Sequence, residues 1–455
     1  MMSLIKKIAS KLGVDKSIAY SSSSRIIGAF ASVATIFFIS RYLTGVEQGF
    51  YYTFGSIVAI QIFFELGLNN IITQYVAHEA SHLSWINTYT LEGEASYKSR
   101  LASLLHFAIK WYSIIAIGFF IILVIVGLVF FSFSYENSDA VSWKIPWMLI
   151  CIGASVNLFT TPLLAILMGL DKVKEVSKMR FYQQLILPLS AWLGLLLGFK
   201  LYVVGISSLL SASYVIIYLF SSDFKKIIHN LWKETIVERV SYMKEIFPYQ
   251  WKIALSWISG YFIFQLFNPV LFATEGPVVA GQMGMTLVVL GGIQAFSASW
   301  LNTKVPLYSK LIALKHYMQL DSLFNKTLKQ MAFICCWLLT IMLVAIFIIR
   351  QTGVKLGDNY LGDRFLGYLP MILMMIPLFI NQYVSSWATY LRCHKQEPFL
   401  YISIVLGILV CSSTLLLGKY MGVIGITAGY CLITLCSLPW AYWIYKTKKR
   451  EWHGK

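Results

Sequence analysis

Apolar runs of about 20 residues recur along the whole chain of 455 residues. A helix of that length crosses the roughly 30 Å hydrocarbon core of a bilayer. Only 13% of the residues are charged, whereas soluble domains carry about 25%. The pattern predicts an all-α polytopic membrane protein with twelve spans, near residues 19–40, 50–72, 106–132, 144–170, 181–199, 201–222, 249–273, 278–301, 327–349, 365–390, 398–417 and 420–445.

The distribution of Lys and Arg predicts the orientation of these spans. An even number of spans puts both termini on one side of the membrane. Of the 37 Lys and Arg residues, 27 lie in the loops on that side, seven lie in the opposite loops, and three lie within spans. Cytoplasmic loops carry the excess of basic residues in membrane proteins, so both termini are expected in the cytoplasm. This bias explains the net charge of +17 without a nucleic-acid partner.

A shift of 227 residues aligns several positions of the two halves, which predicts an internal repeat. The aligned pairs are Arg25 with Lys252, Ser32 with Ser259, and Gly49 with Gly276. Two halves that both begin in the cytoplasm are expected to be related by a pseudo-two-fold axis along the membrane normal. The predicted organisation is a six-helix lobe over residues 1–222, a linker over 223–248, and a second six-helix lobe over 249–455.

The linker has its own pattern. Residues 223–248 place apolar side chains such as Ile227, Leu231 and Val240 at helical spacing among basic residues. This pattern predicts an amphipathic helix lying at the cytoplasmic interface. The alternative is that the segment only connects the two lobes.

Charged residues within the spans are the main functional signal. A charge at bilayer depth costs about 2.5–3.5 kcal/mol, so such a side chain usually faces a bundle interior or a wet cavity. Arg25 and Glu65 are expected at similar depth, and Gln61, Glu65 and Asn69 lie on one helix face at i, i+4 and i+8. One interpretation is a structural ion pair between Arg25 and Glu65. The other, compatible with it, is that Arg25 and Lys252 face a central cavity and attract an anion, unless Lys252 snorkels to the interface.

The candidate substrate-binding residues of this cavity combine the charges, the polar stripe and the repeated serines. They are Arg25, Lys252, Glu65, Gln61, Asn69, Ser32 and Ser259.

Several kinds of active site are missing from the sequence. It contains no GxxxxGK[ST] loop, no HExxH, no GxSxG and no cluster of His and Cys. The seven cysteines have no metal-ligand spacing. The predicted outside loops are too short for a catalytic domain. We therefore expect no catalytic residues, no metal and no cofactor, and a transporter rather than an enzyme.

The stretch ISRYLTGVEQGFYYTFGSIVAIQIFFELGLNNIITQYVA, residues 39–77, resembles the start of Wzx-type O-antigen flippases. These belong to the polysaccharide-transporter branch of the multidrug/oligosaccharidyl-lipid/polysaccharide (MOP) exporter superfamily. Two further turns, MGLDKVKE (168–175) and YLRCHKQEP (390–398), are similar to the family's turns after spans 4 and 10. The residues that match the family pattern in the first stretch are Arg41, Leu43, Gly49, Glu65, Leu66 and Gly67.

The resemblance implies a flippase that moves an undecaprenyl-diphosphate-linked oligosaccharide, the O-antigen repeat unit of lipopolysaccharide biosynthesis, across the bacterial cytoplasmic (inner) membrane. Two lobes would alternate around a central cavity, and Arg25 and Lys252 would meet the diphosphate. Membrane lipids and polysaccharide-assembly proteins are the implied partners. The alternatives are an O-antigen polymerase or ligase, and a cation or drug antiporter of the same superfamily. The sugar, the coupling ion and the oligomeric state are not specified by the sequence.

Overall fold

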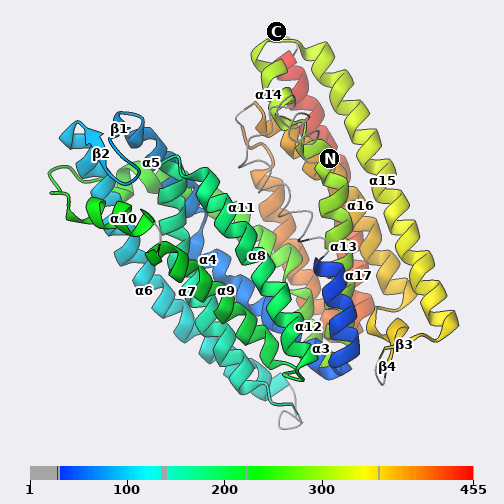
Figure 1. Ribbon diagram of the computed structural model, residues 1–455. Helices are drawn as coiled ribbons and strands as arrows, with labels where there is room; N and C mark the ends of the chain where they lie inside the picture. The colour runs from blue at the N-terminus through cyan, green and yellow to red at the C-terminus, as the bar shows by residue number, and fades with distance from the viewer. Residues whose placement is uncertain are drawn as a thin grey trace, which may run out of the picture. The chain divides into compact units, whose positions relative to one another are not determined.

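The computed structural model describes residue 28 and residues 31–134, 141–221, 223–356, 359–394 and 396–453 (Figure 1). The chain is almost entirely helical, which confirms the predicted all-α polytopic membrane fold. Strands occur in the described residues only as two short antiparallel hairpins, β1 (Leu83–Trp85) with β2 (Leu91–Gly93), and β3 (Lys355–Leu356) with β4 (Asn359–Tyr360).

Seven helices within the described residues are long and apolar enough to cross a membrane, or eight if one bent pair counts as a single span. The predicted number of twelve is larger for three reasons. Residues 19–27, 29 and 30 of the first predicted span, 19–40, lie outside the described residues. Helix α17 (Leu400–His453) runs through two predicted spans, with non-helical backbone at Gly422 (φ 57°) between them. Helices α8 (Val173–Leu196) and α11 (Phe247–Phe264) also coincide with predicted spans without meeting the criterion of length and apolarity.

The chain divides into two compact units. The first contains residues 60–132 and 141–254 of the described chain. Besides α8 and the first part of α11, its helical elements are η1 (Ala59–Gln61), α4 (Ile62–Glu65), α5 (Leu68–Ala80), α6 (Ala95–Ser134), α7 (Lys144–Gly169), α9 (Tyr202–Ser221), α10 (Asp223–Lys233) and η3 (Tyr242–Ile246). The boundary between the two units falls within η1. Helix α7 packs against α5, α8 and α9, and α10 packs against α9. Figure 1 shows α10 lying crosswise to the long axis of α6.

The second unit contains residues 32–59 and 255–453. It includes the helix over residues 31–42 from Ser32 onward. The remaining elements are α3 (Gly45–Val58), α12 (Phe267–Thr274), α13 (Pro277–Asn302), α14 (Val305–Ala313), α15 (Tyr317–Thr352), η4 (Leu361–Arg364) and α16 (Tyr368–Arg392). Helix α13 packs against α3, α12, α15 and α16. The division into two symmetric lobes stays a prediction.

The contact between α3 and α13 is close because glycine is present where the helices meet. A Cβ atom at Gly49 would lie 2.0 Å from the carbonyl oxygen of Pro277, and one at Gly284 would lie 2.4 Å from the side chain of Tyr52. Helix α13 starts with Gly276 at φ 90° and Pro277 at its first position, a combination that favours helix initiation at that point. These residues fix α3 within the second unit.

The predicted linker helix is shorter than expected. Only Asp223–Lys233 is α-helical, and the chain then continues without regular structure to η3. The hydroxyl of Ser99 on α6 accepts hydrogen bonds from the backbone N–H groups of Val237 (2.7 Å) and Glu238 (2.8 Å), and the hydroxyl of Ser103 accepts one from Val240 (3.0 Å). In this part of the linker, backbone N–H groups bond to hydroxyls of α6 instead of to the carbonyl oxygens of a continued helix.

Candidate functional site

The first unit holds a polar cluster where the second predicted span is broken. Helix α4 ends at Glu65, and α5 begins at Leu68 after two residues in the left-handed conformation, Leu66 (φ 45°) and Gly67 (φ 70°). Positive φ is unfavourable for leucine, so packing around the break must hold the chain there. The segments on either side are bent by 41°. The break places the Glu65 carboxylate at the end of one helix piece, next to the start of another.

The predicted polar stripe of span 2 does form, around Glu65. The Gln61 side-chain amide donates a hydrogen bond to one carboxylate oxygen of Glu65, and the Asn69 amide donates to the other at 3.1 Å. The Tyr112 hydroxyl on α6 donates to the Asn69 side-chain oxygen at 3.0 Å. Thr73 ties the same helix to α7 through the carbonyl oxygen of Ala165 at 3.1 Å. The carboxylate is therefore held by neutral donors, which keep it oriented without cancelling its charge.

A cation missing from the sequence prediction lies near this carboxylate. Arg180 on α8 lies near enough for its charge to act on Glu65, but the two side chains form no ion pair within 4 Å. By surface area Arg180 is exposed and Glu65 is half-buried, although the protein around the guanidinium of Arg180 still removes part of its hydration. On the same helix, the Gln183 amide donates to Asn157 of α7 at 3.2 Å. The site thus combines an exposed arginine on α8, an oriented carboxylate on α4, and amides on η1, α5, α7 and α8.

Sequence reasoning missed Arg180 because it was counted with the basic loop over residues 171–180. A signal was present nevertheless. Arg180, Gln183 and Gln184 follow i, i+3, i+4 spacing, which puts all three on one face of a helix that continues into the next span. Arg180 is thus both the last basic residue of the segment 171–180 and the first residue of a polar helix face.

The other predicted site residues fall in different places. Arg25 lies outside the described residues, and so does the side chain of Lys252, whose backbone belongs to α11. The predicted pair of Arg25 with Glu65 therefore has no structural description. Ser32 is half-buried on the helix over residues 31–42. Ser259 is buried and donates to the carbonyl oxygen of Leu255 at 2.8 Å, a bond within its own helix.

The second unit contains a buried arginine that the sequence assigned to an outside loop. Arg364 is 4% exposed. One of its terminal nitrogens donates to the Gln48 side-chain oxygen (3.1 Å), and the other donates to the carbonyl oxygens of Ser40 (3.2 Å) and Leu43 (2.5 Å). Its Nε is buried without a hydrogen-bond partner among the described residues. Burial lowers the pKa of Arg364, and the negative charge of Glu47 opposes this shift.

This second arrangement is a helix cap. Ser40 and Leu43 lie at the C-terminal end of the helix over residues 31–42, where carbonyl oxygens have no helical partner and a cation is favourable. Gln48 also donates to the carbonyl oxygens of Gly281 (2.8 Å) and Arg364 (3.2 Å). Because its guanidinium is enclosed by protein acceptors, Arg364 supports the architecture of the second unit and is not free to meet a ligand.

No metal-binding group of three or more His, Cys, Asp or Glu side chains exists within the described residues. The accessible charges of the first unit can attract an anion through Arg180 or exchange a cation through Glu65.

Comparisons with known proteins identify the fold. Neither the family models nor the curated proteins include a match to this chain. Among solved structures, it is similar to an inward-facing multidrug resistance MATE family transporter of the MOP superfamily, with a TM-score of 0.60, 13% identity, and coverage of 93% of this chain and 99% of the other. It is also similar to the lipid II flippase MurJ in an inward closed conformation, with a TM-score of 0.61, 15% identity, and coverage of 93% and 86%. The chain therefore has the fold of MATE transporters and MurJ, and these solved structures are of transporters, not enzymes.

Proposed function

We propose that this protein is a flippase for a lipid-linked oligosaccharide. It moves an undecaprenyl-diphosphate-linked repeat unit of the O-antigen type from the inner to the outer leaflet of a bacterial cytoplasmic membrane, with both termini in the cytoplasm. The proposal is supported by the fold, which is similar to that of a lipid II flippase, and by the resemblance of residues 39–77 to Wzx-type flippases. Alternating access of two lobes would carry the headgroup across.

The observation that carries the proposal is the exposed Arg180, whose charge acts on the nearby carboxylate of Glu65. An arginine presents a planar fork of donors that can bind phosphate oxygens in a bidentate manner. The charge of Glu65 attracts this guanidinium, while the oxygens of Glu65 accept from Gln61 and Asn69. The diphosphate is common to all such lipid-linked substrates, so an arginine can recognise it regardless of the attached sugar. Arg25 and Lys252 are proposed as further contacts to the diphosphate, with Ser32 and Ser259 as polar neighbours.

The test compares Arg180→Gln with Lys178→Gln, a control on the same helix whose side chain is also exposed. Loss of a charge-assisted bidentate contact is expected to slow flipping by about tenfold or more. The measurements are surface glycan display in a flippase-null strain and flipping of a fluorescent diphosphate-linked lipid in vesicles. Both variants should accumulate in the membrane, and the control should flip at the wild-type rate. Normal glycan display by the Arg180→Gln variant would remove the proposed role of the arginine.

A cation or drug antiporter is the second candidate, and two observations favour it. One solved structure with this fold is a multidrug transporter, and Glu65 is a carboxylate held in place within a predicted span. The same vesicles distinguish the candidates. An antiporter should export a cationic dye, lose that export in the Glu65→Gln variant and retain it in the Arg180→Gln variant, whereas a flippase should export no dye.

A further inference from the structure

The helix of the linker ends where its own residues give no reason for it to end. Helix α10 stops at Lys233, yet residues 223–247 contain neither glycine nor proline, the two residues that interrupt helices most strongly. The apolar spacing that predicts a helix also continues past this point, to Val240 and Phe247. Groups outside the segment must therefore hold residues 234–241, the strap, in a non-helical form.

Two hydroxyls of α6 bind the backbone groups of the strap that a continued helix would use. Ser99 accepts from the N–H groups of Val237 and Glu238, and Ser103 accepts from that of Val240. The Ser99 hydroxyl also donates to the carbonyl oxygen of Glu238 at 3.1 Å. Side-chain groups of this kind compete with helical hydrogen bonds for the same backbone groups. The strap is thus a helix-competent segment that α6 holds in another conformation.

A charged contact, the clasp, fixes the chain just after the strap. Arg100 on α6 donates to the carboxylate of Glu245 at 2.7 Å and to that of Glu79 on α5 at 3.0 Å. The other carboxylate oxygen of Glu245 accepts from the Ser241 N–H at 2.8 Å, and Tyr75 on α5 donates to the Glu245 carbonyl oxygen. Glu245 belongs to the π-helical turn η3, which leads directly into α11. The clasp therefore ties the start of α11 to α5 and α6.

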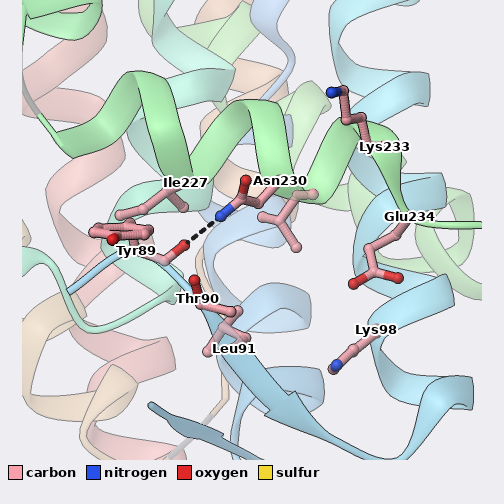
Figure 2. Close-up of a pocket in the computed structure, with 9 residues that line it drawn as sticks. Tyr89, Thr90, Leu91, Lys98, Ile227, Asn230, Lys233 and Glu234 are labelled. Carbon is pink, nitrogen blue, oxygen red and sulfur yellow. Dashed lines mark hydrogen bonds between the residues drawn. The ribbon is translucent and has the colours of Figure 1, made fainter. Parts of the chain in front are cut away.

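The strap is anchored at both ends but is not packed into a core. At the α10 end, the Asn230 amide donates to the carbonyl oxygen of Tyr89 in the β1–β2 connection at 3.1 Å (Figure 2). The ammonium group of Lys226 lies 4.8 Å from the centre of the Tyr89 ring. None of the described side chains of residues 232–245 is buried, and Val237 is 80% exposed. A segment with so few buried apolar contacts opens at a low cost in free energy.

We propose that the strap is a switch between two conformations of the linker. In the strapped state, which this structure shows, the hydroxyls of α6 and the clasp hold residues 234–241. In the released state these residues continue α10 as a helix, and their N–H groups bond to carbonyl oxygens four residues earlier. Both states satisfy the same backbone donors, so the two can be close in free energy.

Switching changes the length of chain between α10 and α11. A helix rises about 1.5 Å per residue, whereas an extended chain covers up to about 3.3 Å, so release shortens the linker. The chain passes from the first unit to the second within α11, between residues 254 and 255. Shortening therefore pulls on a helix that continues into the second unit. This links the switch to the alternating access proposed above, whatever substrate is carried.

The first experiment measures the distance between α6 and the strap in the purified full chain. Spin labels on noncanonical amino acids at the exposed positions Ala95 and Val237 leave the native cysteines in place. Wild type should give mainly one short distance, because Val237 is bonded to Ser99, one turn from Ala95. Ser99→Ala/Ser103→Ala removes three acceptor contacts, so a second, longer distance should gain about tenfold in population. Ser113→Ala, whose hydroxyl donates within α6, is the control. An unchanged single distance in the double variant would overturn the switch.

The same labels test the clasp. Glu245→Gln keeps an acceptor for the Ser241 N–H and leaves the buried Glu79 paired with Arg100, but it removes the charge that Arg100 binds on the linker. The longer distance should gain up to about fivefold in population, as expected for one partly exposed ion pair. No gain in this variant would remove the clasp from the switch.

The second experiment measures transport in vesicles, with the diphosphate-linked lipid or the dye, whichever wild type carries. Arg239 is exposed, and its N–H has no hydrogen-bond partner among the described residues. Arg239→Pro should therefore keep the strapped distance but forbid the released helix, and transport should slow by about tenfold or more. Arg239→Gln removes the same charge, permits the helix and should transport at the wild-type rate. If proline itself disturbs the strap, Arg239→Gly disfavours the helix more mildly and repeats the test. Wild-type transport by a variant that shows only the short distance would overturn the switch, even if the transported substrate is not a lipid.

Discussion

Arg364 in the second unit and Arg180 in the first both interact with a carboxylate, but their surroundings differ. Arg364 is buried, and its terminal nitrogens donate to Gln48 and to the carbonyl oxygens of Ser40 and Leu43. Arg180 is exposed, and Glu65 interacts with it through charge. An enclosed guanidinium stabilises the fold around it, whereas an exposed one keeps donors for a ligand. The two arginines should therefore separate stability from transport when they are replaced.

The largest expected effect on stability comes from Arg364→Gln. The substitution leaves the buried carbonyl oxygens of Ser40 and Leu43 without their charged donor, so we expect a loss of about 3–5 kcal/mol in the free energy of unfolding. Thermal and denaturant unfolding of the purified protein in detergent measures this loss.

Arg180→Gln is the counterpart in that measurement. It should unfold at nearly the wild-type temperature, because an exposed side chain makes few stabilising contacts. If both variants are destabilised to the same extent, the distinction between a structural Arg364 and an exposed Arg180 is wrong.

A smaller effect is expected from Gly49→Ala, which tests the packing beside Gln48. The new Cβ would lie 2.0 Å from the carbonyl oxygen of Pro277, so α3 and α13 must separate. Such overpacking costs about 1–3 kcal/mol. Gly55→Ala on the same helix is the control, since its Cβ would meet nothing within 4 Å. That control should be neutral or stabilising by up to about 1 kcal/mol, and an equal loss in both variants would mean that helix contact is not the cause.

The smallest effect is expected in an ion-pair network of the first unit. Arg100 donates to Glu79 at 3.0 Å and to Glu245 at 2.7 Å, and Glu245 also accepts from the Ser241 N–H. Burial acts to raise the pKa of Glu245, but these hydrogen bonds and the Arg100 charge outweigh it and lower the pKa below its ordinary value of 4.5. A lowered pKa means that the ionised form stabilises the fold above pH 4.5 and that this contribution disappears as the pH falls further.

Glu245→Gln should therefore cost about 1 kcal/mol or less near neutral pH, as expected for a partly exposed pair. The difference in unfolding temperature between wild type and variant should shrink as the pH is lowered from about 6 to about 3.5. A difference that stays constant over this range would show that the charge of Glu245 does not contribute.

The polar stripe of span 2 was predictable because its spacing is a property of a single helix. Gln61, Glu65 and Asn69 do meet, although Leu66 and Gly67 interrupt the helix between them. The partner of Glu65 was not predictable in the same way. Arg180 is 115 residues further along the chain, and only the packing of α5, α7 and α8 in one unit brings it near. The interrupted linker helix also depended on distant groups, the hydroxyls of Ser99 and Ser103.

The sequence by itself determined the class of the protein. Repeated apolar runs require a helical membrane fold, because backbone groups in lipid must be satisfied within each segment. The unequal distribution of Lys and Arg predicts its orientation in the same local way. Only the tertiary structure decided which charges are available. Whether an arginine is enclosed like Arg364 or accessible like Arg180 depends on side chains from distant segments, and no local pattern contains that information.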